Sequence, residues 1–194
     1  MDEFKQGELD VIVGPVSCGK SEELIRRLKR AIIAKRKIQV FKPIVDNRIL
    51  DGQKENCICS RNKEQLKATP VISGIEILNN IDNDTKVIGI DEVEMFEDDI
   101  VTIIRQITDQ LKLRVIVSGL DMDFRGEPFS IISKLLSIAE NIDKLNAICM
   151  RCGNSASMSQ RLLQSGKDPH WNDPVIIPGD DYEARCKKCH VILR

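Results

Sequence analysis

Gly14-Pro15-Val16-Ser17-Cys18-Gly19-Lys20-Ser21 decides the fold, because it fits the pattern G-x-x-x-x-G-K-[ST] at every fixed position. An apolar run precedes it at 9–13, and an amphipathic helical pattern follows it at 22–34. A strand, this loop and a helix in that order form a P-loop, whose backbone N–H groups converge on phosphate oxygens. The alternative is a glycine turn that matches the pattern by chance, but such a turn would not be expected to have both an apolar run before it and a helical pattern after it. We therefore expect all eight residues to bind ATP, with Lys20 on the β- and γ-phosphates and Ser21 on Mg²⁺.

Two acidic residues follow a second apolar run, Val87-Ile88-Gly89-Ile90, as Asp91 and Glu92. The carboxyl end of a parallel strand is where α/β folds bind their ligands. Asp91 is suited to hold the hydration shell of Mg²⁺, and Glu92 points the other way, toward a nucleophile. The alternative is that both acids only cap the turn that follows the strand.

Further apolar runs at 38–41 and 115–117, and a second helical pattern at 100–111, alternate with these segments. Strands that alternate with helices predict βαβ units. The fold class is therefore α/β, a P-loop NTPase-like parallel sheet flanked by helices. Residues 46–69 are polar with little periodicity, which predicts a loop or an irregular hairpin.

Four cysteines near the end of the chain form two C-x-x-C pairs, Cys149 with Cys152 and Cys186 with Cys189. Four thiolates in this pairing are what a tetrahedral structural Zn²⁺ requires. A redox-active C-x-x-C would need a thioredoxin-like βαβ context, which is missing here. His190 adjoins Cys189, and neighbouring residues rarely bind the same ion, so we interpret it as a bystander. The change in character near Leu145 divides the chain into an ATP-binding domain at 1–145 and a small zinc-binding lobe at 146–194.

The composition fits a soluble globular protein, with 194 residues, 42% hydrophobic and 30% charged. The net charge of −1 argues against a nucleic-acid partner, which would favour a basic excess. The sequence contains no apolar run long enough to span a bilayer, and the N-terminal residues lack the pattern of a signal peptide. Seven cysteines, an odd number, argue against a disulfide framework. We expect a cytoplasmic protein with no membrane partner.

The order of these motifs resembles the zinc-containing thymidine kinases of many bacteria and of vertebrate cytosol, over nearly the whole chain. The matching segments are 14–15 with 19–27, Phe41-Lys42-Pro43, Asp46-Asn47-Arg48, 88–93, Gly119-Leu120-Asp121 through Gly126, Pro128-Phe129, 147–149, Cys152-Gly153, Arg161 and 182–186.

This resemblance implies transfer of the ATP γ-phosphate to the 5′-hydroxyl of thymidine or deoxyuridine. It implies that Glu92 is the general base and that Asp46 and Arg48 lie near the phosphates and the metal. It also implies a loop between the zinc knuckles that closes over the nucleoside, and assembly as a homotetramer. The nucleoside-binding residues that it implies are Leu120, Phe124, Phe129, Arg161, Ile176 and Tyr182.

The sequence departs from the family pattern mainly on the nucleoside side. Val16 stands where a methionine that touches the base is usual, and Glu94 replaces a glutamine, adding a charge that is unfavourable unless it is solvated or paired. Other departures are Ser17, Cys18, Arg61, Met158, Ser159, Pro178 and the spacing of Gly179 to Tyr182. Two alternatives therefore stay open: a relative that binds ATP or nucleoside with little turnover, and a kinase of another deoxynucleoside.

Overall fold

The computed structural model describes residues 7–44, 56–59, 64–163, 166–175 and 181–194. Its centre is a six-stranded parallel sheet in the order β5-β2-β6-β7-β1-β8. The strands are β1 Leu9–Val13, β2 Ile38–Pro43, β5 Thr69–Val71, β6 Val87–Ile90, β7 Arg114–Gly119 and β8 Asn141–Lys144. Parallel strands end at the same edge, so the segments after β1, β6 and β7 meet there. The predicted parallel α/β sheet is confirmed.

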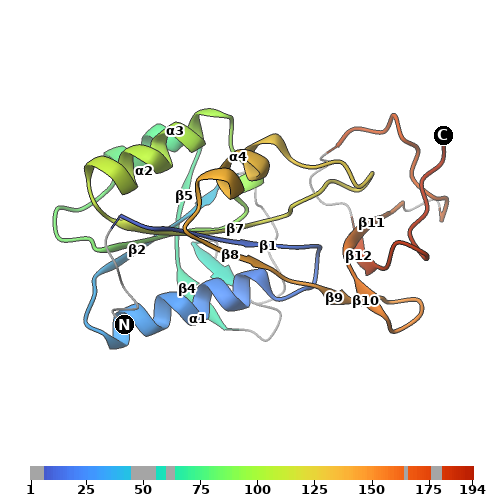
Figure 1. Ribbon diagram of the computed structural model, residues 1–194, viewed down its shortest axis with the longest axis horizontal. Helices are drawn as coiled ribbons and strands as arrows, with labels where there is room; N and C mark the ends of the chain where they lie inside the picture. The colour runs from blue at the N-terminus through green and yellow to red at the C-terminus, as the bar shows by residue number, and fades with distance from the viewer. Residues whose placement is uncertain (1–6, 45–55, 60–63, 164–165, 176–180) are drawn as a thin grey trace.

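Helices cover both faces of this sheet (Figure 1). The helix α1, Lys20–Ile33, packs on one face against a core that includes Ile12, Val40 and Ile116. The opposite face is covered by α2 Gly74–Asn79, α3 Asp99–Arg105 and α4 Ser130–Ile138. A short 3-10 turn, η1 Val93–Met95, follows β6, and the π-helical turn η2 Gln106–Gln110 continues α3.

Three two-stranded antiparallel sheets complete the described elements. One pairs β3 Cys57–Cys59 with β4 Gln65–Lys67, which confirms an irregular hairpin in the described part of 46–69. The others pair β9 Ala147–Ile148 with β10 Ser155–Ala156, and β11 Met158–Leu162 with β12 Asp181–Arg185. These two form a lobe beyond the carboxyl ends of β1 and β8 (Figure 1). The proposed domain boundary near Leu145 falls between β8 and β9.

The buried charge of Asp10 in β1 is stabilised by hydrogen bonds from neighbouring strands of the sheet. Asp10 is fully buried, and its carboxylate accepts hydrogen bonds from Arg114 Nη2 at 2.5 Å and Asn141 Nδ2 at 2.9 Å. A buried carboxylate is tolerated when it is paired in this way. Asp10 therefore links β1 to Arg114 of β7 and Asn141 of β8.

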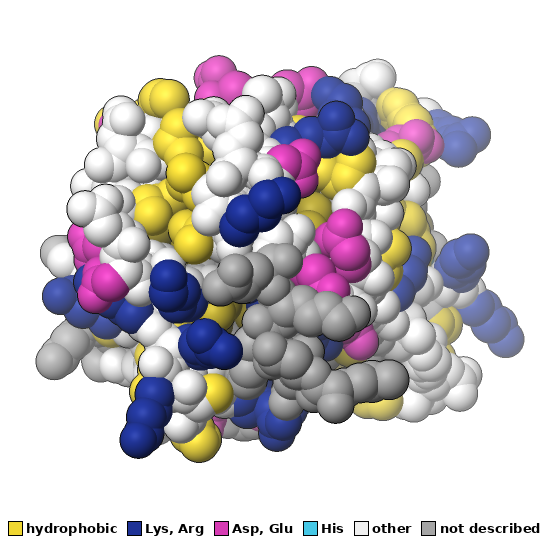
Figure 2. Space-filling view, turned by 60° about the vertical axis from the view of Figure 1, so that its left-hand side comes forward, with side chains coloured by type: hydrophobic (Ala, Val, Ile, Leu, Met, Phe, Trp, Pro, Cys, Tyr) yellow, Lys and Arg dark blue, Asp and Glu magenta, His cyan; other side chains and the backbone are white. Residues whose placement is uncertain are grey.

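The surface carries mixed charge. Figure 2 shows acidic and basic side chains interspersed with hydrophobic ones on one face of the molecule. Within the described ranges, every helix is too short or too polar to traverse a bilayer.

Candidate active site

The P-loop occupies residues 14–19, between the end of β1 and the start of α1, as predicted. Gly14 has φ 150°, and a Cβ there would lie 2.4 Å from the Leu145 carbonyl oxygen. Gly19 has φ 89° and precedes Lys20, the first residue of α1. Both positions thus require glycine, one for space and both for conformation. The resulting loop ends at the N-terminus of α1, and a glycine-rich loop before a helix N-terminus is an arrangement that binds phosphate.

Lys20 lies inside the loop rather than in solvent. Its side chain is 7% exposed, and its Nζ donates a hydrogen bond of 2.8 Å to the Pro15 carbonyl. The adjacent Cys18 thiol has its pKa raised by burial, against a lowering effect of Lys20. A thiol with a raised pKa stays protonated, so Cys18 is a loop residue rather than an activated nucleophile.

The two acids after β6 lie at the same edge of the sheet as the P-loop, because β6 pairs with β7 and β7 pairs with β1. Asp91 is buried, and its Oδ1 accepts hydrogen bonds from Ser118 Oγ at 2.5 Å and from the Glu92 N–H at 3.1 Å. Ser118, on β7, was not among the residues predicted from the sequence. It holds one Asp91 oxygen, which orients the carboxylate.

Glu92 has left-handed backbone angles, φ 50° and ψ 45°, and is 8% exposed. A residue other than glycine rarely adopts this conformation, and such strain is concentrated at functional sites. Burial and strain together fit a side chain that is placed for chemistry.

The P-loop also contacts the C-terminal lobe. The Val16 N–H donates to Ser159 Oγ on β11 at 3.1 Å, and Val16 packs against a small apolar cluster of the lobe that includes Ala147 and Ala184. Both residues of this hydrogen bond are departures from the family pattern. The sequence marked each of them separately, but only the fold shows that they touch.

On the predicted nucleoside side, the structure brings Phe124, Arg161 and Tyr182 close to one another. The Arg161 guanidinium lies 5.2 Å from the centre of the Phe124 ring, and Arg161 pairs with Tyr182 across the β11–β12 hairpin. Phe124 and Arg161 are each only 1% exposed. Arg161 Nη1 donates to the Pro174 carbonyl at 2.7 Å, which ties the hairpin to the segment that precedes residue 176.

The remaining predicted nucleoside residues are placed differently. Leu120 directly follows β7 at the ligand edge, whereas Phe129 directly precedes α4 and packs against the main core. Asp46, Arg48 and Ile176 lie outside the described residues, as do Arg61, Pro178 and Gly179. Their predicted roles stay predictions.

A metal site can form in the lobe. The sulfur atoms of Cys149, Cys152, Cys186 and Cys189 all lie within 4.8 Å of one another, and none of these cysteines is in a disulfide. Four thiols arranged in this way fit the tetrahedral thiolate shell of a structural Zn²⁺. His190 is held elsewhere, with its Nε2 2.8 Å from the Phe124 carbonyl oxygen. This contact agrees with its interpretation as a bystander, and it links the lobe to the segment after β7.

We predict one Zn²⁺ per chain, bound by these four cysteines. Replacing Cys186 with serine should release the metal and lower the melting temperature, because a structural zinc site contributes directly to folding. Metal analysis of the purified protein and thermal unfolding measure the two effects. Cys57→Ser in β3 is the control and should keep its zinc. A wild-type protein with well under half an equivalent of zinc and full stability would contradict the prediction.

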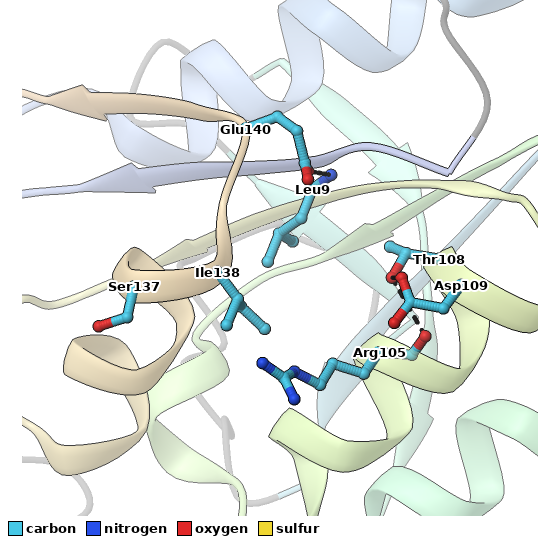
Figure 3. Close-up of a pocket in the computed structure, with 7 residues that line it drawn as sticks. All are labelled: Leu9, Arg105, Thr108, Asp109, Ser137, Ile138 and Glu140. Carbon is cyan, nitrogen blue, oxygen red and sulfur yellow. Dashed lines mark hydrogen bonds between the residues drawn. The ribbon is translucent and has the colours of Figure 1, made fainter.

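A separate hollow of about 420 Å³ lies at the other end of the sheet. Figure 3 shows Arg105 pointing into it and the Glu140 carboxylate bonded to the Leu9 N–H, at 2.7 Å. Leu9 begins β1, whereas the P-loop follows its last residue, Val13. This hollow therefore does not belong to the phosphate-binding edge.

Comparison with known proteins adds a family. The sequence model of the family described as thymidine kinase matches residues 7–190. Among solved structures, the chain is similar to the flagellar accessory protein FlaH from Methanocaldococcus jannaschii, with 16% sequence identity and a TM-score of 0.48. That similarity covers 78% of this chain and 76% of FlaH.

Proposed function

This chain belongs to the thymidine kinase family, and we propose that it transfers the γ-phosphoryl group of ATP to the 5′-hydroxyl of thymidine, and also of deoxyuridine. The observation that carries the proposal is the placement of the P-loop and the Asp91–Glu92 pair at one edge of the sheet. A nucleotide held by the P-loop would there have a buried carboxylate beside its terminal phosphate. A nucleoside kinase needs that combination, and a simple nucleotide-binding protein does not.

In the proposed reaction, Glu92 accepts the proton of the 5′-hydroxyl as that oxygen forms a bond to the γ-phosphorus. The bond from the γ-phosphorus to the β–γ bridging oxygen breaks, and its electron pair leaves with ADP. Lys20 stabilises the charge that develops on the phosphate oxygens. Burial of Glu92 at 8% exposure keeps water from competing for the same proton.

A bound Mg²⁺ would be held by Ser21, at the start of α1, and by Asp91, and it would neutralise charge on the β- and γ-phosphates. Asp91 fits this role because the hydrogen bond from Ser118 fixes one of its carboxylate oxygens. Asp46 and Arg48 complete the proposed phosphate neighbourhood.

The lobe would cover the nucleoside. The buried Phe124 and Arg161 and the partly buried Tyr182 lie where the lobe meets the segment after β7, and they support a pocket at this junction. Backbone groups of the covering loop can recognise a pyrimidine whatever side chains it carries, so substitutions such as Met158 need not change the base preference. A homotetramer and a cytoplasmic location are part of the proposal, and both come from the family alone.

Steady-state kinetics with a set of deoxynucleosides tests the proposed substrate. We expect thymidine and deoxyuridine to have the highest kcat/KM, deoxycytidine to be well behind, and purine deoxynucleosides to be inactive. Val16 is shorter than the usual methionine, and one lost methylene-sized contact costs about 1–3 kcal/mol, so the KM for thymidine should be high for the family. A purine deoxynucleoside ahead of thymidine would contradict the assignment. No turnover of any nucleoside would favour a binding protein.

A further inference from the structure

Glu94 is a buried acid whose carboxyl oxygens have no donor group as a partner among the described residues. It lies in η1, two residues after Glu92, and is 5% exposed. Within the described part of the chain, neither of its carboxyl oxygens receives a hydrogen bond from a donor group. An ionised carboxylate in that position would keep the full cost of its desolvation.

The surroundings of this carboxyl group are apolar and tightly packed. A Cβ added to Gly119 would lie 2.4 Å from Glu94 Oε2, and the same position is within 3.0 Å of Ile132 Cδ1 and 3.1 Å of Val93 Cγ1. Glu94 Oε2 therefore lies close to Gly119 at the end of β7. Burial accordingly raises the pKa of Glu94 well above its usual 4.5, and the charge of Glu92 and a hydrogen bond with Glu92 raise it further.

Other charges do not reverse this effect. Lys20 acts on Glu94 in the opposite direction, but less strongly than burial and Glu92 together. Strands β2 and β7 and helix α4 pack against η1. The basic residues of these elements are paired with other acids or point away from η1. Lys134 of α4 pairs with the exposed Asp98, and Arg114 pairs with Asp10 at the far end of β7. On β2, Phe41 belongs to the core that contains Val93 of η1, and its neighbour Lys42 therefore faces the other side of the strand.

We propose that Glu94 is a positioning residue: its protonated carboxyl group donates a hydrogen bond to the Glu92 carboxylate and fixes that base toward the substrate. A protonated carboxyl has one O–H donor, and an ionised one has none. A hydrogen bond between two carboxyl groups therefore needs a proton on one of them, and Glu94 is the more buried of the pair. The inference rests on the proposed role of Glu92 as the base.

This arrangement explains why the strained Glu92 backbone is useful. The left-handed turn at Glu92 directly precedes η1, which contains Glu94, and the charge of Glu92 acts on the Glu94 carboxyl group. A donated hydrogen bond favours the ionised form of Glu92, which must be ionised to accept a proton. Neutral Glu94 supplies an O–H donor where a glutamine would supply an N–H donor, so it replaces the usual glutamine without adding charge near the triphosphate.

Two variants separate a hydrogen-bond donor from simple packing. Glu94→Leu fills the same space without a hydrogen-bond donor. We expect kcat to fall about 10–100-fold, because Glu92 is then no longer held in position to accept the proton of the substrate hydroxyl. The KM for ATP should change little. Glu94→Gln restores a neutral donor and should recover most of the lost kcat. Both variants should melt no lower than the wild type at neutral pH, because neither leaves an acid buried at position 94.

The pH dependence gives a second signature. The folded chain holds the Glu94 proton to a higher pH than the unfolded chain. The wild type should therefore lose stability relative to Glu94→Gln as pH rises from about 4.5 through the folded pKa. Over the alkaline part of that range, wild-type kcat should fall as Glu94 ionises, and the Gln variant should lack this fall.

Infrared difference spectroscopy of wild type against Glu94→Gln tests the protonation without any substrate. At neutral pH we expect the carbonyl stretch of a protonated carboxylic acid in the wild type and its loss in the variant. Absence of that band, or a Gln variant as slow as the Leu variant, overturns the proposal. Because the band does not depend on turnover, an inactive wild type that shows it would refute the proposed function and leave the protonation of Glu94 intact.

Discussion

Lys20→Ala is expected to remove ATP-dependent phosphoryl transfer, with a loss in kcat/KM on the order of 10³ or more. The lysine charge is needed as negative charge moves onto the β-phosphate during the reaction. In the structure, Lys20 lies inside the P-loop and bonds to the Pro15 carbonyl, so its Nζ is already directed into the phosphate-binding loop. Product formation from thymidine and ATP is the measurement.

Two further variants make this result specific. Lys20→Met keeps the aliphatic part of the side chain and removes only the charge, so it should be nearly as inactive as the alanine variant. Lys29→Ala lies on the same helix and removes only a surface ion pair with Glu64 at 3.1 Å, so it should keep wild-type turnover. Near wild-type turnover in Lys20→Met would exclude the P-loop lysine from the chemistry.

Glu92→Gln is the sharper test of mechanism. Glutamine keeps the shape and the hydrogen bonding of the side chain but cannot accept the proton of the 5′-hydroxyl. Loss of a general base should lower kcat by about 10²–10⁴-fold. Affinity for ATP, measured by calorimetry, should hardly change, because the P-loop holds the phosphates. The same substitution at the exposed Glu97, just beyond η1, is the control and should leave kcat unchanged.

A Glu92→Gln variant within a few-fold of wild type would show that another carboxylate is the base. Asp121 is then the strongest candidate, since it is buried at the same edge of the sheet and its oxygens meet only the Lys144 ammonium, at 2.9 Å, among the described side chains. Glu94 would be a weaker candidate, because a protonated acid cannot accept a proton. The two outcomes thus distinguish the roles of neighbouring acids.

The sequence predicts the centre of the fold well because the P-loop and the central strands are local signals. Strands β1, β6 and β7 are buried on both faces, so they read as continuous apolar runs. The strand β8 could not be found in this way, because it is an edge strand and three of its four residues are exposed. The helix α4 was missed although its sequence carried a signal, an apolar stripe at 131, 132, 135 and 136.

Helix ends and the lobe were harder to predict. The pattern at 100–111 predicted one helix, whereas the chain forms α3 and then the π-turn η2, in which Thr108 Oγ bonds to the Ile104 carbonyl at 3.2 Å. After residue 145 the sequence carries no regular apolar pattern from which strands of the lobe could be predicted. The lobe contains two short hairpins, which are held by cross-strand pairing and the cysteine cluster rather than by periodic apolar residues.

Within the site, the sequence predicted which residues take part, but it did not predict which side chains form hydrogen bonds with them. The P-loop, Asp91 and Glu92 were predicted from the loop motif and from the apolar run before each of them. The contacts of Ser118 with Asp91 and of Ser159 with Val16 join segments far apart in the chain, and no local pattern announces them. The expected charge at Glu94 was also a local inference, and only the packing of Gly119 and Ile132 shows how deeply that acid is buried.

The most direct test is product analysis after incubation of the zinc-loaded wild-type chain with Mg²⁺, thymidine and ATP labelled at the γ-phosphate. We predict that the label appears on the 5′-oxygen of thymidine, as thymidine 5′-monophosphate, in step with the formation of ADP. Label found only in free phosphate, or retained in ATP at any concentration of thymidine, would contradict the proposal that the P-loop and Glu92 form the active site of a thymidine kinase.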